Sequence, residues 1–171
     1  METPSRTRIM SPERVQRTLR RLAYEIVEHN RGAEQLSVFG IRTSGVPLAE
    51  ALTREINRIE EADLTAHGLD VTPFRDDRAE GARGSQSPVD VTDRDVILVD
   101  DVLFTGRTAR AALDAIIQFG RPRSIQLVVL IDRGHREYPI QPDYVGRQLQ
   151  TKHREQVVVD TGGDFAVYVE D

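Results

Sequence analysis

The chain has 171 residues, of which 39% are hydrophobic and 30% are charged, and its formal net charge is −5. This is a soluble globular composition, and no apolar run approaches the roughly 20 residues that span a bilayer, so a membrane protein is excluded. The acidic net charge argues against a protein that coats nucleic acid indiscriminately, and the lack of cysteine excludes disulfides, thiolate nucleophiles and zinc–cysteine sites.

The first residues are polar and lack the apolar core of a secretion signal. We therefore expect a cytoplasmic protein with no membrane partner. The length is that of one ordinary domain, so we expect a single domain over residues 1–171.

Residues 11–29 predict a helix that begins with Ser11 as N-cap and Pro12 at the first helical position. The sequence Asn-Arg-Gly at 30–32 ends it. Apolar residues fall on one stripe at helical spacing, which predicts that this stripe faces the core. These residues are Val15, Leu19, Leu22, Ala23, Ile26 and Val27.

The next elements predict a strand, a turn and a second helix. Residues 36–41 (LSVFGI) are typical of a short buried strand, and 42–45 (RTSG) of a turn. A helix is expected over 46–61, with an inward face. That face consists of Leu48, Leu52, Ile56 and Ile59.

The segment that follows is less regular. Residues 69–74 (LDVTPF) alternate as a strand does, but Pro73 confines them to a sheet edge or a strand end. Residues 75–90 carry Gly, Ser and charges without periodicity, which predicts a mobile surface loop.

Strands at 96–99 and 125–131 flank a helix at 107–119. A βαβ unit whose strands are continuously apolar indicates a parallel sheet covered on both faces. We expect an irregular stretch over 132–154.

Two late strands, QVVVD and FAVYV, are joined by a hairpin loop at 161–164. The pattern predicts an α/β fold with an antiparallel appendage.

The stretch VILVDDVLFTGRT carries the chemistry. A buried strand ends on Asp100 and Asp101, at the edge where doubly wound sheets bind ligands. Adjacent carboxylates repel each other and are best tolerated beside hydroxyl donors or a metal ion. Residues 105–108 (TGRT) then enter a helix, where exposed N–H groups and the helix dipole favour an anion. The stretch therefore predicts a ligand with a diol and a phosphate, as in ribose 5-phosphate.

This stretch resembles the phosphoribosyl pyrophosphate (PRPP) signature of type I phosphoribosyltransferases. Nearly the whole chain is similar to the pyrimidine operon attenuation regulators that are also uracil phosphoribosyltransferases. GIRTSG, LDVTPFRDD, IQLVVLIDRGHRE and PDYVGR carry that wider similarity. The resemblance implies a mainly parallel central sheet flanked by helices, with a small hood and a flexible antiparallel lid.

The resemblance implies conversion of uracil and PRPP to UMP and diphosphate, with Mg²⁺ bound to PRPP and water beside Asp100 and Asp101. These two carboxylates would hold the ribose hydroxyls, with Arg75 as a third catalytic group. Residues implied to bind the ribose and 5′-phosphate are Asp100, Asp101, Val102, Leu103, Phe104, Thr105, Gly106, Arg107 and Thr108.

The other ligand groups are assigned by the same resemblance. Residues implied to bind diphosphate are Arg42, Thr43, Ser44 and Arg83; the family usually has a second arginine where Ser44 stands. Residues implied to bind uracil or UMP are Arg133, Val157 and Val158. His135, in the same turn as Arg133, is interpreted as structural rather than as a general base.

Such proteins also bind the leader mRNA of the pyrimidine operon with the help of UMP, and the resemblance implies a homodimer or higher homo-oligomer. Residues implied to contact RNA are Arg20, Arg136, Arg147 and Lys152. Two alternatives stay open: a phosphoribosyltransferase without RNA binding, and a purine phosphoribosyltransferase with the same signature.

Overall fold

The computed structural model describes residues 4–75 and 89–171, and two sheets organise them. The larger sheet is parallel, with strand order β3-β2-β4-β5-β6. These strands are β2 (Leu36–Ile41), β3 (His67–Leu69), β4 (Asp95–Leu103), β5 (Ser124–Asp132) and β6 (Tyr144–Gln148). The parallel sheet flanked by helices confirms the predicted fold class.

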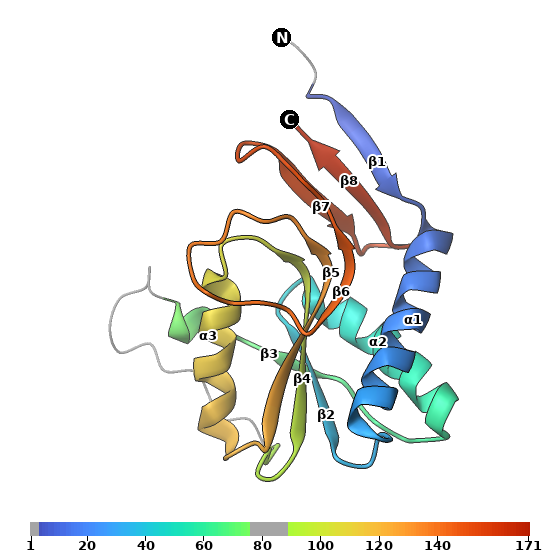
Figure 1. Cartoon of the computed structure of the whole chain (residues 1–171), viewed down its shortest axis with the longest axis vertical. Coiled ribbons are helices and arrows are strands. Elements are labelled where there is room, and N and C mark those ends of the chain that lie inside the picture. The colour runs from blue at the N-terminus through green and yellow to red at the C-terminus, as the bar shows by residue number, and fades with distance from the viewer. Residues whose placement is uncertain (1–3, 76–88) are drawn as a thin grey trace.

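Helices cover both faces of this sheet (Figure 1). Helices α1 (Pro12–Asn30) and α2 (Gly45–Glu60) pack on one face, and α3 (Arg107–Ile116), followed by the 3-10 turn η2 (Ile117–Phe119), packs on the other. Each face has its own apolar core cluster. Continuous apolar strands such as β4 are stable here because both of their faces are buried.

Helix α1 confirms the pattern predicted from sequence. Ser11 accepts a hydrogen bond from the Arg14 N–H, and the six predicted stripe residues are the buried ones. In α2, Leu48, Leu52 and Ile56 are buried as predicted, and Ile59 is partly buried against the same core cluster.

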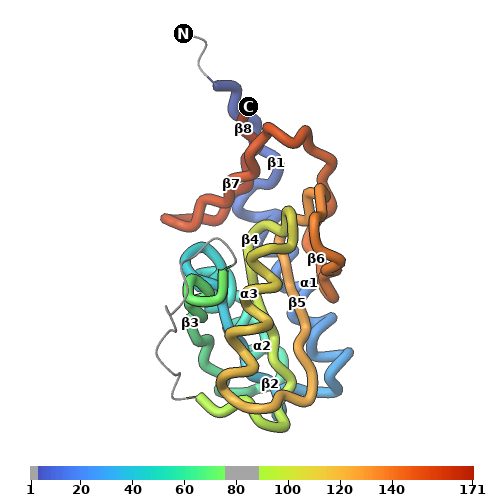
Figure 2. The backbone as a smooth tube through the Cα atoms, turned by 90° about the vertical axis from the view of Figure 1, so that its left-hand side faces the viewer, coloured from blue at the N-terminus to red at the C-terminus, as the bar shows by residue number. Residues whose placement is uncertain are grey.

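The smaller sheet is antiparallel, with order β1-β8-β7, and we call it the hood. It consists of β1 (Arg6–Met10), β7 (Gln156–Asp160) and β8 (Ala166–Glu170). The hood stands beyond the ends at which β4 and β5 finish (Figure 2). The predicted pairing of the two late strands is confirmed.

Two predictions about elements were wrong, and one strand was not predicted. Residues 69–74 are not a strand: β3 ends at Leu69, and Thr72–Phe74 form the 3-10 turn η1, since Pro73 cannot donate to a ladder. The stretch 132–154 contains β6, which was expected to be irregular. The polar N-terminal segment forms β1, which pairs with β8 across the whole chain.

The predicted loop and lid fall mainly on residues 76–88, which include Arg83. These residues lie outside the described residues. None of the helices in the described part of the chain has the length and apolarity that a bilayer crossing requires.

Candidate functional site

The two aspartates lie near the carboxyl end of β4, inside the strand rather than after it, because β4 continues to Leu103. Both are half-buried. The Asp101 N–H donates to Asp100 Oδ1 at 2.8 Å, and the Val102 N–H donates to Asp101 Oδ1 at 2.8 Å. One oxygen of each carboxylate is thereby held by the backbone, which orients the pair.

The electrostatics of the pair are unfavourable without a ligand. Burial, and then the neighbouring Asp101 carboxylate, raise the pKa of Asp100 well above its ordinary value. A group that supplies hydroxyl donors or a cation would relieve this cost. Such a pair is therefore suited to a diol or to a ligand that carries a metal ion.

The loop between β4 and α3 ends in a helix N-terminus. Gly106 is the N-cap of α3 and has φ +91°, a conformation that favours glycine. The first N–H groups of a helix have no partner inside the helix, so the start of α3 presents donors to an anion. The Arg107 N–H is the exception, because it donates to Thr105 Oγ1 at 3.3 Å. The helix N-terminus, a favourable position for an anion, thus lies one short loop away from the aspartates.

Arg107 in this loop is already paired. Its Nε donates to Glu137 at 2.7 Å and its Nη1 donates to the Tyr138 hydroxyl at 2.8 Å. The Thr105 carbonyl oxygen accepts from the N–H groups of Glu137 and Tyr138 as well. Sequence reasoning missed both partners, since no local pattern marks a contact over 30 residues.

The 42–44 loop lies against the aspartates because of two glycines. A Cβ atom at Gly45 would lie 2.4 Å from the Val99 carbonyl oxygen and 3.4 Å from Asp100 Cα. A Cβ atom at Gly40 would lie 2.6 Å from the Gly45 carbonyl oxygen. The start of α2 thus packs directly on the backbones of β2 and β4, which brings the loop before it to Asp100. A glycine inside a strand signals such close approach, so Gly40 could have been identified from sequence.

Arg42 and Arg75 occupy exposed positions near this edge of the sheet. The Arg42 N–H donates to the Leu69 carbonyl oxygen at 2.9 Å, and its guanidinium crosses β3 at Gly68, where a Cβ atom would lie 2.6 Å from Nε. The peptide bond between Arg42 and Thr43 is cis. Arg75 directly follows η1, which packs beside α3.

Arg133 follows β5 and is buried, with 6% of its surface exposed. Its guanidinium donates to Thr151 Oγ1 and to the Lys152 carbonyl oxygen, both at 3.0 Å, and burial lowers its pKa. Val157 and Val158, the other residues predicted for uracil, are half-buried in β7 of the hood.

The residues predicted for RNA are scattered. Arg136 is mostly buried and donates to Ile140, Phe104 and Asp132, and Arg147 donates to the Ile9 carbonyl oxygen at 3.1 Å. Arg20 lies 3.7 Å from Glu55, and Lys152 is exposed. Their assignment to RNA stays a prediction, with Arg20 and Lys152 the more accessible pair.

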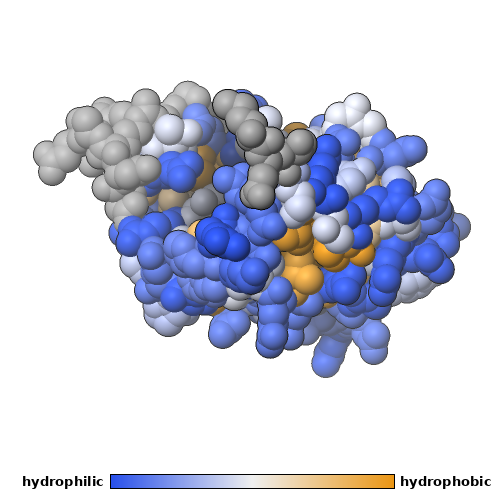
Figure 3. Space-filling view, turned by 90° about the horizontal axis from the view of Figure 1, so that it is seen from above, coloured by the Kyte–Doolittle hydropathy of each residue, from blue (hydrophilic) through white to orange (hydrophobic). Residues whose placement is uncertain are grey.

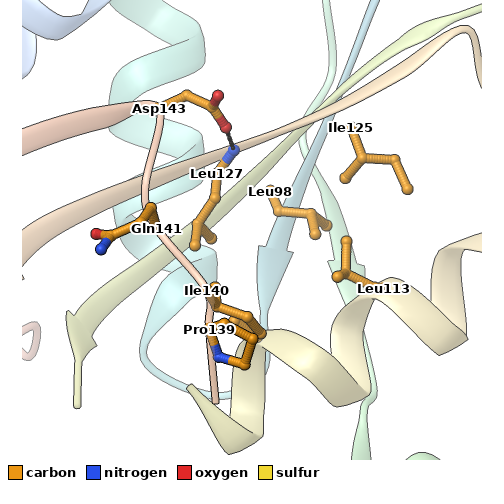
Figure 4. Close-up of a pocket in the computed structure, with 9 residues that line it drawn as sticks. Leu98, Leu113, Ile125, Leu127, Pro139, Ile140, Gln141 and Asp143 are labelled. Carbon is orange, nitrogen blue, oxygen red and sulfur yellow. Dashed lines mark hydrogen bonds between the residues drawn. The ribbon is translucent and has the colours of Figure 1, made fainter. Parts of the chain in front are cut away.

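Viewed from above, most of the surface is hydrophilic and hydrophobic residues form small areas (Figure 3). A separate pocket of about 220 Å³ lies between α3, β4, β5 and residues 139–143 (Figure 4). Its walls are mainly apolar, and its Asp143 carboxylate accepts the Leu127 N–H at 2.7 Å. This pocket therefore lacks the protein groups that suit an anion and a diol, which are gathered at the carboxyl edge of the sheet.

Residues 5–164 match the model of the phosphoribosyl transferase domain family. The chain is 51% identical over 164 residues to the bifunctional protein PyrR of Deinococcus radiodurans, covering 93% of this chain and 89% of that protein. It is 44% identical over 155 residues to the pyrimidine operon regulatory protein of Lactococcus lactis, covering 91% of this chain and 90% of the relative.

Solved structures share the fold at low identity. A hypoxanthine phosphoribosyl transferase of Trypanosoma cruzi superposes with a TM-score of 0.76 at 15% identity, covering all of this chain and 94% of that one. A hypoxanthine-guanine phosphoribosyltransferase of Bacillus anthracis has a TM-score of 0.73 at 20% identity, with 98% and 99% of the chains covered.

Proposed function

Because this chain belongs to the phosphoribosyltransferase family, and within it to the PyrR proteins, we propose that it transfers the phosphoribosyl group of PRPP to uracil. The products are UMP and diphosphate. The observation that carries the proposal is the convergence of Asp100 and Asp101, the N-terminus of α3 and the 42–44 loop at one edge. The donor PRPP carries a diol, a phosphate and a leaving diphosphate, and each of these requires one of the three protein groups.

Each group then has one task. Asp100 and Asp101 accept hydrogen bonds from the ribose hydroxyls, and the N–H groups at the start of α3 receive the 5′-phosphate. The backbone of residues 42–44 and the Arg42 guanidinium receive the diphosphate. Val157 and Val158 of β7 lie on the hood side, where their backbone groups serve the polar edge of uracil.

The reaction needs positioning more than a nucleophile. The bond from ribose C1 to the diphosphate oxygen breaks, a uracil nitrogen bonds to C1, and the proton of that nitrogen is lost to solvent. Positive charge develops on the ribose ring as the diphosphate leaves. The Asp100 and Asp101 carboxylates, held by backbone N–H groups, stabilise that charge without having to reorganise.

Magnesium is part of the proposal, and the residues present fit it. No group of three or more metal-ligating side chains occurs among residues 4–75 and 89–171, so a fully protein-bound cage is not offered there. Two carboxylates, Asp100 and Asp101, together with the oxygens of the donor are a set that Mg²⁺ favours. The bound ion would neutralise diphosphate charge.

The experiment is turnover of uracil by the Asp101→Asn variant. UMP formation should fall by well over about tenfold, because an amide cannot stabilise the developing charge. Asp114→Asn is the matched control: this partly exposed aspartate on α3 pairs with Arg110 and lies outside the site. Near-unchanged turnover in Asp101→Asn rejects the proposal, and preferential use of hypoxanthine, guanine or adenine by the unmodified protein identifies a purine enzyme instead.

A second function, binding of pyrimidine leader mRNA in the presence of UMP, is supported by a basic hollow on α1. Arg14, Arg17, Thr18 and Arg21 line it. Arg21 Nη2 donates to the Gly146 carbonyl oxygen at 2.7 Å, which fixes the hollow against β6. Clustered arginines suit the phosphates and unstacked bases of RNA loops.

Gel shifts with leader mRNA test this second function. Arg17→Gln should weaken binding both with and without UMP, while Arg121→Gln, an exposed arginine in the loop before β5, should not. Equal weak binding by the unmodified protein with and without UMP argues for catalysis alone.

We further propose a homodimer. Among the described residues, the exposed large apolar side chains are Tyr24, Leu113 and Ile117, and two of them share α3 and the turn after it. A molar mass of one chain, measured by light scattering, would reject the homodimer.

A further inference from the structure

Arg133 is a buried cation whose side-chain hydrogen bonds all go to one segment, residues 151–153. Nε donates to Thr151 Oγ1 at 3.0 Å, and Nη2 donates to the carbonyl oxygens of Lys152 at 3.0 Å and His153 at 3.5 Å. These acceptors are neutral oxygens. Burying a charge is costly, so a guanidinium kept in such a place is held there by geometry that other side chains cannot reproduce.

The other side of the guanidinium lies on the donor loop. Arg133 Cζ is 4.1 Å from the centre of the Phe104 ring, and Phe104 stands between the aspartates and the start of α3. The Arg133 N–H also donates to the Leu103 carbonyl oxygen at 3.1 Å. One side chain therefore touches the loop proposed to bind PRPP and the segment 151–153.

Segment 151–153 leads into the hood. It lies between the end of β6 at Gln148 and the start of β7 at Gln156, three residues before the first hood strand on this path. His135 contacts the same segment, since its Nε2 lies 2.7 Å from the Thr151 carbonyl oxygen. The rings of Phe104, His135 and His153 pack together at centroid distances of 5.3 to 5.6 Å.

We propose that Arg133 is a positioning residue that sets the hood strand β7 against the PRPP loop, and that it is not itself a ligand of uracil. The inference rests on the proposed function, because it assigns β7 to the base and the β4–α3 loop to the donor. The planar fork is what the role requires: it donates to segment 151–153 along its edge while its face covers Phe104. A lysine carries the charge but has neither the fork nor the face.

The experiment compares Arg133→Lys with the unmodified protein in three measurements. The KM for uracil should rise by at least about tenfold and kcat should fall, since a displacement of about 1 Å between the reacting groups is this costly. The Kd of PRPP with Mg²⁺, measured by calorimetry without uracil, should stay within about twofold. Amide hydrogen exchange in Val157–Val159 should accelerate by at least about tenfold, with β5 unchanged.

Arg94→Lys is the matched control. Its guanidinium also donates to three oxygens, those of Glu34, Leu36 and Ser37, but at the opposite end of the sheet. Exchange in β7 and the uracil KM should not respond to this change.

Every other outcome of the Arg133→Lys experiment either supports or overturns the inference. A raised uracil KM with unchanged β7 exchange makes Arg133 a direct uracil ligand, and an equal loss of PRPP affinity makes it a general support of the site; either overturns the inference. If Arg133→Lys does not fold, Thr151→Val removes one acceptor and should still accelerate exchange in β7, and its failure to do so overturns the inference. If the unmodified protein makes no UMP, the proposed function fails, while the exchange data still decide whether Arg133 holds β7.

Discussion

Replacing Gly45 with alanine tests how the 42–44 loop is brought to Asp100. The added Cβ atom would lie 2.4 Å from the Val99 carbonyl oxygen, whereas ordinary contact begins near 3.4 Å. Because the obstacle is backbone of a central strand, the start of α2 has to move outward by the difference, about 1 Å. The loop before α2 moves with it, away from Asp100.

Two energies compete in this variant. Alanine is favoured over glycine by up to about 1 kcal/mol in a helix interior, and this is an upper bound for Gly45, the first residue of α2. Overpacking against rigid neighbours costs about 1–3 kcal/mol, so the net effect is a modest loss of stability. The catalytic effect is larger, because a misplacement of about 1 Å lowers the rate by about 100-fold.

The assay is UMP formation with PRPP as the varied substrate, together with calorimetric unfolding. Gly45→Ala should lower kcat/KM for PRPP by about 100-fold while the protein remains folded. Gly163→Ala, in the loop between β7 and β8, is the control, since nothing lies within 4 Å of its Cβ position. A folded Gly45→Ala protein with kcat/KM within about threefold of the original would refute the reasoning.

Two further predictions concern charged groups. Asp100→Asn should raise Tm at neutral pH, because burial and Asp101 raise the pKa of Asp100 in the folded protein. Ionisation of Asp100 therefore costs stability as pH rises through the folded-state pKa. Calorimetry should find that the gain in Tm vanishes below the ordinary aspartate pKa. A gain that is independent of pH would contradict this cause. Glu137→Gln should change the unfolding free energy by less than about 1 kcal/mol, because the pair with Arg107 is about half-exposed. Its Kd for PRPP should fall by up to about fivefold, since Arg107 is released toward the 5′-phosphate, and an unchanged or higher Kd would show that Glu137 does not compete for it.

Local patterns predicted the elements that depend on local physics. The α1 stripe from Val15 to Val27 follows from helical spacing alone, and the N-cap at Ser11 follows from side-chain chemistry. β1 and β6 were missed because their residues are mixed in polarity. They become strands only by pairing with β8 and β5, a contact that no local window contains.

The site divides in the same way. Asp100, Asp101 and Gly106 were predictable because a strand end and a helix start follow each other within a few residues. The internal hydrogen bonds of Arg133 and Arg136 were not predictable, since the sequence pattern of a polar turn does not show which distant residues an arginine contacts. Only the fold shows that their guanidinium groups are occupied by residues of the chain itself.

The hood joins strands from opposite ends of the described chain, with Arg6 opposite Glu170. During synthesis at about 5–20 residues per second, β1 leaves the ribosome roughly 8 to 30 s before β8 can pair with it. The strands of the parallel sheet, β2 to β6, all precede β7 and β8 in the chain, so the hood is the last sheet that can be completed.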